Sequence, residues 1–236
     1  MNKARLSGLW MCVATAAALV SFSAIAERAD NLFKLEKNSR ILAYLTGNET
    51  SKKLFELGSA WDRKLGLQDS CKSQYSVRTR PGDIIVHRTI DLPSGAMHPV
   101  EGLWQVRFSL ERCGKSQIYN ALVFAADGAP PTYQTLLPGR TLGSPVLLQD
   151  VLTQLTPKVM AESKAKQNRE CEDFIVTDTD LTVPPKVVGT GAEVTLAGNY
   201  EETWTIRYCG ANIRISLCFS PNAGGGTSFI SKPCSQ

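Results

Sequence analysis

The stretch Glu101-Gly-Leu-Trp-Gln-Val-Arg-Phe108 recurs one hundred residues later as Glu201-Glu-Thr-Trp-Thr-Ile-Arg-Tyr208. The first glutamate, the tryptophan and the arginine are identical at matched positions, and two apolar positions hold near-equivalent residues. Cys71 and Cys171 keep the same offset, and each stretch is soon followed by a Cys-Gly pair. The simplest explanation is a tandem pair of related, disulfide-bonded β modules.

The repeated stretch alternates as a strand does, with successive side chains on opposite faces of a sheet. The aromatic and β-branched residues share one face, which predicts the core side of each module. The charged residues share the other face and are the candidate ligand-binding residues: Glu101, Arg107, Glu201 and Arg207. An arginine can bind a carboxylate or a phosphate through two parallel hydrogen bonds. The alternative is a solvated face without a ligand.

The pattern of residues 1–26 predicts a secretory signal peptide. Lys3 and Arg5 precede an apolar run that ends at the small-residue cleavage site Ala24-Ile-Ala26. An uncleaved membrane anchor is the alternative, because the uncharged run is long enough to cross a bilayer. We expect a mature chain of residues 27–236, periplasmic or secreted, with no membrane span after cleavage.

The charge balance bears on the class of partner. The chain carries 26 basic and 22 acidic residues, and losing Lys3 and Arg5 with the leader lowers the net charge from +4 to +2. Nucleic-acid binding depends on an excess of basic residues that neutralise phosphates. We therefore expect no nucleic-acid partner, and no motif in the chain implies a cofactor. The oligomeric state is left open.

Six cysteines follow the leader: Cys71, Cys113, Cys171, Cys209, Cys218 and Cys234. An even number behind a signal peptide indicates disulfides formed in an oxidising compartment. Equivalent cysteines of a repeat should pair alike, which predicts Cys71–Cys113 and Cys171–Cys209 and leaves Cys218–Cys234. A zinc site is the alternative, but no Cys-x-x-Cys spacing supports it. No metal ligand is assigned.

The order of helical and strand patterns predicts an α+β fold. It has an N-terminal helical hairpin, then two related disulfide-bonded antiparallel β modules joined by a helix. Ser144-Pro145 begins the joining helix with a cap and a proline where no amide donor is needed. The expected units are the hairpin at 27–70, the first module at 71–143, the helix at 144–170 and the second module at 171–236. Residues 129–143 are expected to form a loop.

The second half contains a Trp-x-Ile-x-x-Cys-Gly element, Trp204 to Gly210, and a closing Gly225-Gly226-Thr227. Over roughly residues 171–232 it resembles a group of small exported bacterial proteins with these two motifs. That group has no assigned activity, so the resemblance implies an exported β protein and no function. The first module departs from the pattern, because four residues separate Phe108 from Cys113 and Gly-Gly-Thr is absent.

The leading functional hypothesis is a non-enzymatic binding or cell-envelope accessory protein whose partner is another envelope or extracellular protein. One alternative is a secreted inhibitor of a hydrolase that presents residues 129–143 or 220–227. The other is an enzyme with an atypical site near His87 and His98, where Asp83 and Asp91 share the strand parity of His87. The familiar serine-hydrolase and zinc-protease motifs are missing. The two modules are duplicated, but the two histidines have no counterparts in the second module, which favours binding.

Overall fold

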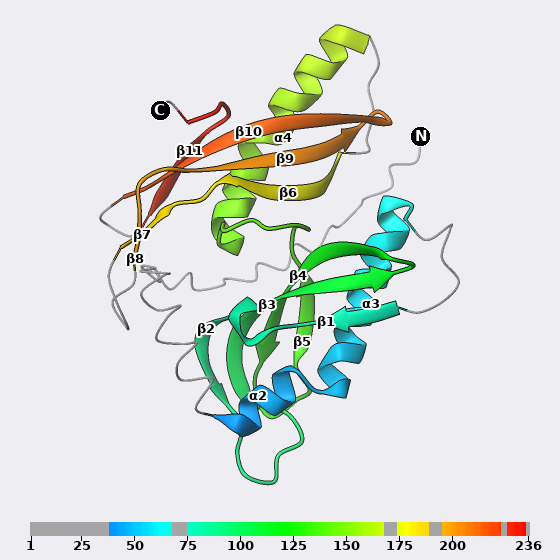
Figure 1. The fold of residues 1–236 in the computed structure, drawn as a ribbon, viewed down its shortest axis with the longest axis vertical. Helices are drawn as coiled ribbons and strands as arrows, with labels where there is room; N and C mark the ends of the chain where they lie inside the picture. The colour runs from blue at the N-terminus through cyan, green and yellow to red at the C-terminus, as the bar shows by residue number, and fades with distance from the viewer. Residues whose placement is uncertain (1–37, 68–74, 168–173, 189–194, 223–225, 235–236) are drawn as a thin grey trace, which may run out of the picture.

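The computed structural model describes residues 38–67, 75–167, 174–188, 195–222 and 226–234. This part of the chain is mostly β, with a five-stranded antiparallel sheet, a four-stranded antiparallel sheet and a two-stranded ribbon. A long helix lies against each of the two larger sheets (Figure 1). The predicted signal peptide, residues 1–26, lies outside the described residues.

The first sheet has the order β1-β3-β4-β5, and β2 also pairs with β3. Its strands are β1 (Tyr75–Arg78), β2 (Ile84–Asp91), β3 (Glu101–Arg112), β4 (Lys115–Ala125) and β5 (Thr132–Thr135). β1 pairs with the last third of β3 and β2 with its first half, so both lie along the same edge of β3. A short 3₁₀ turn, η1 (Pro81–Asp83), connects β1 to β2.

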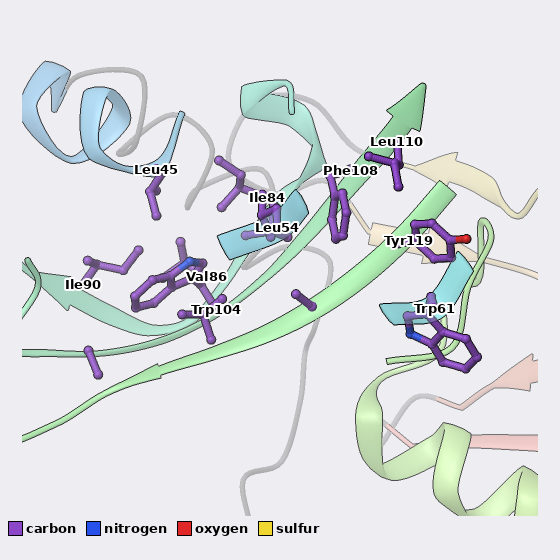
Figure 2. Packing of buried hydrophobic residues seen from close by; sticks show 14 of the residues in the cluster. Leu45, Leu54, Trp61, Ile84, Val86, Ile90, Trp104, Phe108, Leu110 and Tyr119 are labelled. Carbon is purple, nitrogen blue, oxygen red and sulfur yellow. The ribbon is translucent and has the colours of Figure 1, made fainter. Parts of the chain in front are cut away.

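Helices α2 (Ser39–Leu45) and α3 (Asn48–Leu65) precede this sheet. Leu54, Trp61 and Leu65 recur at helical spacing and bury one face of α3 in the core of the first sheet. Figure 2 shows Trp61 beside Tyr119 of β4, and their rings stack with centroids 6.4 Å apart. A Cβ at Gly58 would lie 3.1 Å from atoms of Leu110 and Phe108, so this glycine allows α3 to approach the sheet closely.

The second sheet has the order β11-β10-β9-β6. Its strands are β6 (Ile175–Val183), β9 (Tyr200–Tyr208), β10 (Ala211–Pro221) and β11 (Thr227–Ile230). The ribbon consists of β7 (Lys186–Val188) and β8 (Thr195–Ala197). Helix α4 (Pro145–Gln167) precedes this sheet and continues through Pro157. The Oγ of Ser144 accepts a hydrogen bond from the amide of Leu147 at 3.3 Å, which confirms the predicted cap.

The two repeated stretches occupy corresponding places, β3 between β1/β2 and β4, and β9 between β6 and β10. The residues predicted to face the core are all buried: Trp104, Val106, Phe108, Trp204, Ile206 and Tyr208. Each stretch leads into a two-residue hairpin turn whose central residues have positive φ, Cys113-Gly114 and Cys209-Gly210. Two positive φ values in a two-residue hairpin define a type I′ turn, which explains the repeated Cys-Gly pair.

The α+β prediction, with a separate helical hairpin and a joining helix, is wrong. The described chain is mostly β, and no helical pair stands apart from the sheets, because α3 is buried in the core of the first sheet. Helix α4 is likewise part of the second core, through Leu148, Val151, Leu155 and Val159. Helical periodicity shows which face is apolar, but it does not show whether another helix or a sheet covers that face.

The disulfide between Cys218 and Cys234 is confirmed, with their Cα atoms 4.9 Å apart. Cys113 and Cys209 are each disulfide-bonded. Their expected partners, Cys71 and Cys171, lie outside the described residues. Residues 129–143, expected as a loop, contain strand β5. Within the described ranges, no helix combines the length and apolarity needed to cross a bilayer.

Candidate functional site

A cleft of about 370 Å³ opens beside β1 and β3 of the first sheet. Its lining is rich in arginine and also offers two hydroxyl groups. The lining residues are Arg78, Arg80, Asp83, Arg107, Phe108, Ser109, Glu111, Ser116, Ile118 and Arg140. Four guanidinium groups against two carboxylates give the cleft a positive balance at neutral pH. Such a lining favours a ligand that carries negative charge.

The pleat of β3 places alternate residues on the cleft side. Arg107, Ser109 and Glu111 follow each other at two-residue intervals, and β1 pairs beside them with Arg78 opposite Ser109. The Nη2 of Arg78 lies 3.1 Å from Glu111 Oε2 in an exposed ion pair. Exposed ion pairs contribute only about 0–1 kcal/mol, so a ligand anion could replace Glu111 as the partner of Arg78 at low cost.

The guanidinium of Arg107 has a fixed orientation in this cleft. Its Nε donates a hydrogen bond to Asn120 Oδ1 at 3.3 Å, and its Nη2 donates to the carbonyl oxygen of Thr141 at 2.6 Å. Asn120 is buried, and its Nδ2 donates to the carbonyl oxygens of Leu137 and Gly139 at 2.8 and 3.0 Å. The same asparagine therefore orients Arg107 and holds the backbone beside Arg140.

Gly139 lets this segment lie against β6 of the second sheet. Its φ is +98°, and a Cβ there would lie 2.2 Å from the carbonyl oxygen of Thr179. The Oγ1 of Thr179 accepts a hydrogen bond from the amide of Thr141 at 3.1 Å and donates one to the carbonyl of Pro138 at 2.7 Å. One wall of the cleft is thus attached to both sheets.

Glu202, from β9, is a fully buried carboxylate at the inner end of this network. Its Oε1 accepts hydrogen bonds from Thr141 Oγ1 at 3.0 Å and from the amide of Leu142 at 2.7 Å. Its Oε2 accepts from the indole Nε1 of Trp204 at 2.8 Å. Burial raises the pKa of Glu202, while these donors and the positive charge of Arg107 oppose the rise. Thr141 connects Arg107 to Glu202 through its carbonyl and its hydroxyl.

Glu202 is not among the site residues predicted from the sequence. The signal was available, because Glu202 is two residues before Trp204 and strand alternation places both on the same, buried face. A carboxylate on the core face of a strand needs polar partners. The partners come from residues 141–142, a distant segment that no local pattern connects to β9.

The four predicted ligand-binding residues do not form a single site. Glu101 is exposed at the start of β3, six residues from Arg107, which corresponds to about 20 Å along a strand. Glu201 accepts hydrogen bonds from the amide of Cys234 at 2.9 Å and the hydroxyl of Thr182 at 3.3 Å. Of the four, only Arg107 lines the cleft.

Arg207 binds the end of a helix in the other half of the molecule. Its Nη1 donates to the carbonyl oxygen of Leu65 at 3.1 Å and its Nη2 to that of Lys64 at 2.8 Å. These are among the last carbonyls of α3, which have no partner within the helix. The matched arginines of the repeated stretch therefore both contact residues outside their own sheets.

His87 and His98 are half-buried, in β2 and in the loop that follows it. The Nδ1 of His98 lies 3.5 Å from the carbonyl oxygen of Pro99. Of the predicted neighbours, Asp83 lines the arginine cleft, and Asp91 is exposed at the end of β2. The described residues contain no cluster of three histidine, cysteine, aspartate or glutamate side chains that could hold a metal ion.

Comparison with known proteins identifies no relative of this chain. No family model, curated protein or solved structure matches this chain.

Proposed function

We propose that this chain is an exported, non-enzymatic binding protein whose arginine cleft takes a small ligand with a carboxylate or phosphate group. The observation that carries the proposal is the convergence of Arg78, Arg80, Arg107 and Arg140 on one cleft. Its volume, about 370 Å³, falls within the range typical of small-molecule sites. Ser109 and Ser116 supply hydroxyl groups that can bind the neutral part of a ligand.

The arginines of the cleft have different roles in this proposal. Arg107 donates from Nε and Nη2 to Asn120 and Thr141 and so holds a positive charge at a fixed position in the site. Arg80 and Arg140 are exposed and supply charge at the rim. A guanidinium held in place in advance loses little side-chain entropy when an anion binds.

An oxidising location outside the cytoplasm is part of the proposal. The disulfide between Cys218 and Cys234 supports it, because such bonds persist in the periplasm and outside the cell. The predicted signal peptide agrees with that location.

The test is calorimetric titration of the mature chain with inorganic phosphate, sulfate and citrate. We expect at least one of these anions to bind, and the double variant Arg80→Ala/Arg140→Ala to bind it at least about tenfold more weakly, since hydrogen bonds to charged groups contribute roughly 1.5–3 kcal/mol each. The matched control is Arg214→Ala/Lys186→Ala, which removes the same charge at exposed positions on β10 and β7. Equal affinities for both double variants, or no binding of any anion, would contradict the proposal.

A further inference from the structure

A second hollow lies between β11 and α4, in the second half of the molecule. Its volume is about 440 Å³, and its lining residues are Gln154, Leu155, Lys158, Phe229, Ile230, Ser231 and Lys232. Its lining residues come from α4 on one side and from β11 and the two residues after it on the other. None of the arginines of the cleft described above belongs to it.

β11 is an edge strand of the second sheet in the part of the chain that the structure describes. Within the described segments, β10 is the only strand that pairs with it. Protein sheets usually protect such edges with charged residues, prolines or bulges. The four residues of β11, Thr227 to Ile230, include no charge and no proline, and Ile230 is 45% exposed. The described residues therefore leave this edge open to another strand.

The groove between this edge and the helix is apolar at its base and basic at its rim. Leu155 is buried beneath it, and Phe229 and Ile230 line the strand side. Lys158 and Lys232 are exposed, and the seven lining residues, all of them described, include no aspartate or glutamate. Lys158 Nζ donates to Ser231 Oγ at 2.6 Å, and an ammonium group has two further N–H donors for another acceptor.

We propose that β11 and α4 form a docking groove for an extended segment of another exported protein. The segment adds to β11 as a further strand, places an apolar side chain over Leu155 and Phe229, and presents a carboxylate to Lys158 and Lys232. Strand addition beside a helix is a recurring mode of peptide recognition, in which main-chain hydrogen bonds supply affinity and pockets for alternate side chains supply specificity.

The chemistry of the groove favours a peptide over a fatty acid. A fatty acid could match the apolar base and the two lysines. It offers no donors or acceptors along its chain, so the outer backbone groups of β11 would lose water without gaining partners. An extended peptide satisfies those groups along its whole length.

The charge of the groove also argues against a second copy of this chain. In a symmetric pairing, β11 would lie beside another β11, which reads Thr-Ser-Phe-Ile and is followed by Ser231 and Lys232. Residues 222–236 contain no aspartate or glutamate, so such a pairing would supply no carboxylate to Lys158 or Lys232.

The test uses the full mature chain and a library of synthetic hexapeptides. The peptides alternate valine and threonine and carry an aspartate or a glutamate near one end. Binding is measured by fluorescence anisotropy, and protection of β11 amides by hydrogen exchange. We expect members of this library to bind and to protect β11, and the same peptides with lysine in place of the acid to bind at least about tenfold more weakly.

The decisive variant is Lys158→Glu/Lys232→Glu, which reverses the charge of the rim. We expect it to prefer the lysine peptides, while Lys52→Glu/Lys186→Glu, an equal change of charge on α3 and β7, keeps the original preference. Far-UV circular dichroism and the melting temperature check that both variants are folded. An unchanged preference in the rim variant overturns the proposal, because the charge pattern would then play no part.

Three other outcomes also overturn it. The first is displacement of the bound peptide by laurate, and the second is a concentration-dependent dimer that Lys232→Glu abolishes. The third is no binding by any peptide up to about 1 mM, a Kd that corresponds to a binding free energy of roughly −4 kcal/mol. The anion site is tested separately. Arg80→Ala/Arg140→Ala should leave peptide binding unchanged, so either proposal can fail while the other stands.

Discussion

Glu202 and Gly102 occupy the same position in the two repeated stretches, two residues before the buried tryptophan. In the second half, Glu202 accepts the indole hydrogen bond of Trp204. In the first half, Gly102 has no side chain, and the indole Nε1 of Trp104 has no hydrogen-bond partner among the described residues. A buried donor without an acceptor costs about 1–3 kcal/mol. The carboxylate of Glu202 thus removes a cost that the first half retains.

The variant Glu202→Gln tests this role. All three partners of the carboxylate donate hydrogen bonds to it. The amide nitrogen of a glutamine cannot accept a hydrogen bond, so one of these donors would lose its acceptor. We expect a loss of about 1–3 kcal/mol in the free energy of unfolding at neutral pH, measured by urea denaturation. The control is Glu101→Gln, a change at the exposed start of β3, which should alter stability by less than about 0.5 kcal/mol.

The contribution of Glu202 to the free energy of unfolding should change with pH in a definite direction. Burial raises the pKa of Glu202 in the folded protein. The folded state therefore holds the proton more tightly than the unfolded chain, where a glutamate titrates near pH 4.3. Stability from this group is fully present below about pH 4 and falls as pH rises through the folded pKa. The advantage of wild type over Glu202→Gln should then be larger at pH 4 than at pH 7, and an advantage that grows with pH would contradict this assignment.

At the scale of whole elements, the short connection between β5 and α4 makes hydrogen bonds to both sheets. Residues 137–143 contact Asn120 of the first sheet and both Thr179 and Glu202 of the second. Gly139 makes this passage possible, because its φ is +98° and a Cβ there would overlap the backbone of Thr179. Neither sheet could keep its contacts with this segment if the glycine were larger.

A series of three glycine variants separates the effect of a positive φ from that of steric overlap. Gly139→Ala combines a side chain at positive φ with a steric overlap, and we expect it to destabilise the protein by more than about 3 kcal/mol. Gly66→Ala, at the left-handed end of α3, should cost about 1 kcal/mol, because among the described residues no non-adjacent atom lies within 4 Å of the added Cβ and only the backbone strain remains. Gly82→Ala has neither problem and should be close to neutral. Thermal and urea denaturation give the ranking, and Gly139→Ala no worse than Gly66→Ala would contradict the close approach.

Some elements could be predicted from the sequence because their causes are local. The hairpin turns at Cys113-Gly114 and Cys209-Gly210, the cap at Ser144 and the core face of the repeated strands follow from neighbouring residues. Strand β5 could not be predicted in this way. It has four residues, three prolines lie close to it, and it depends on pairing with β4. The packing of α3 and α4 against the sheets could not be predicted for a related reason, because those sheets are assembled from residues that are distant in the sequence.

At the scale of the molecule, the charged face of the repeated strand was predicted to bind ligand twice, and the two arginines have different surroundings. Arg107 lines the cleft and bonds to Thr141, whereas Arg207 bonds to the carbonyls of Lys64 and Leu65. The sequence shows that an arginine lies on the outer face of each strand. It does not show which segment of the other half that face meets, because this depends on how the two sheets are placed. Only the three-dimensional arrangement distinguishes the arginine that lines the cleft from the one that joins the two halves.

The role of Arg207 in joining the halves makes a prediction about the whole molecule. Arg207→Ala should cost about 1–3 kcal/mol in the free energy of unfolding, because it removes two charge-assisted hydrogen bonds and a cation at the C-terminal end of α3. Hydrogen exchange should rise in the last turn of α3, although the substitution is in β9. Arg207→Lys keeps the cation but cannot reach both carbonyls with a planar fork, so its loss should be intermediate. Arg214→Ala, on the exposed face of β10, is the control and should change stability by less than about 0.5 kcal/mol. If Arg207→Ala matches that control, or if exchange rises only within β9, Arg207 does not join the two halves of the molecule.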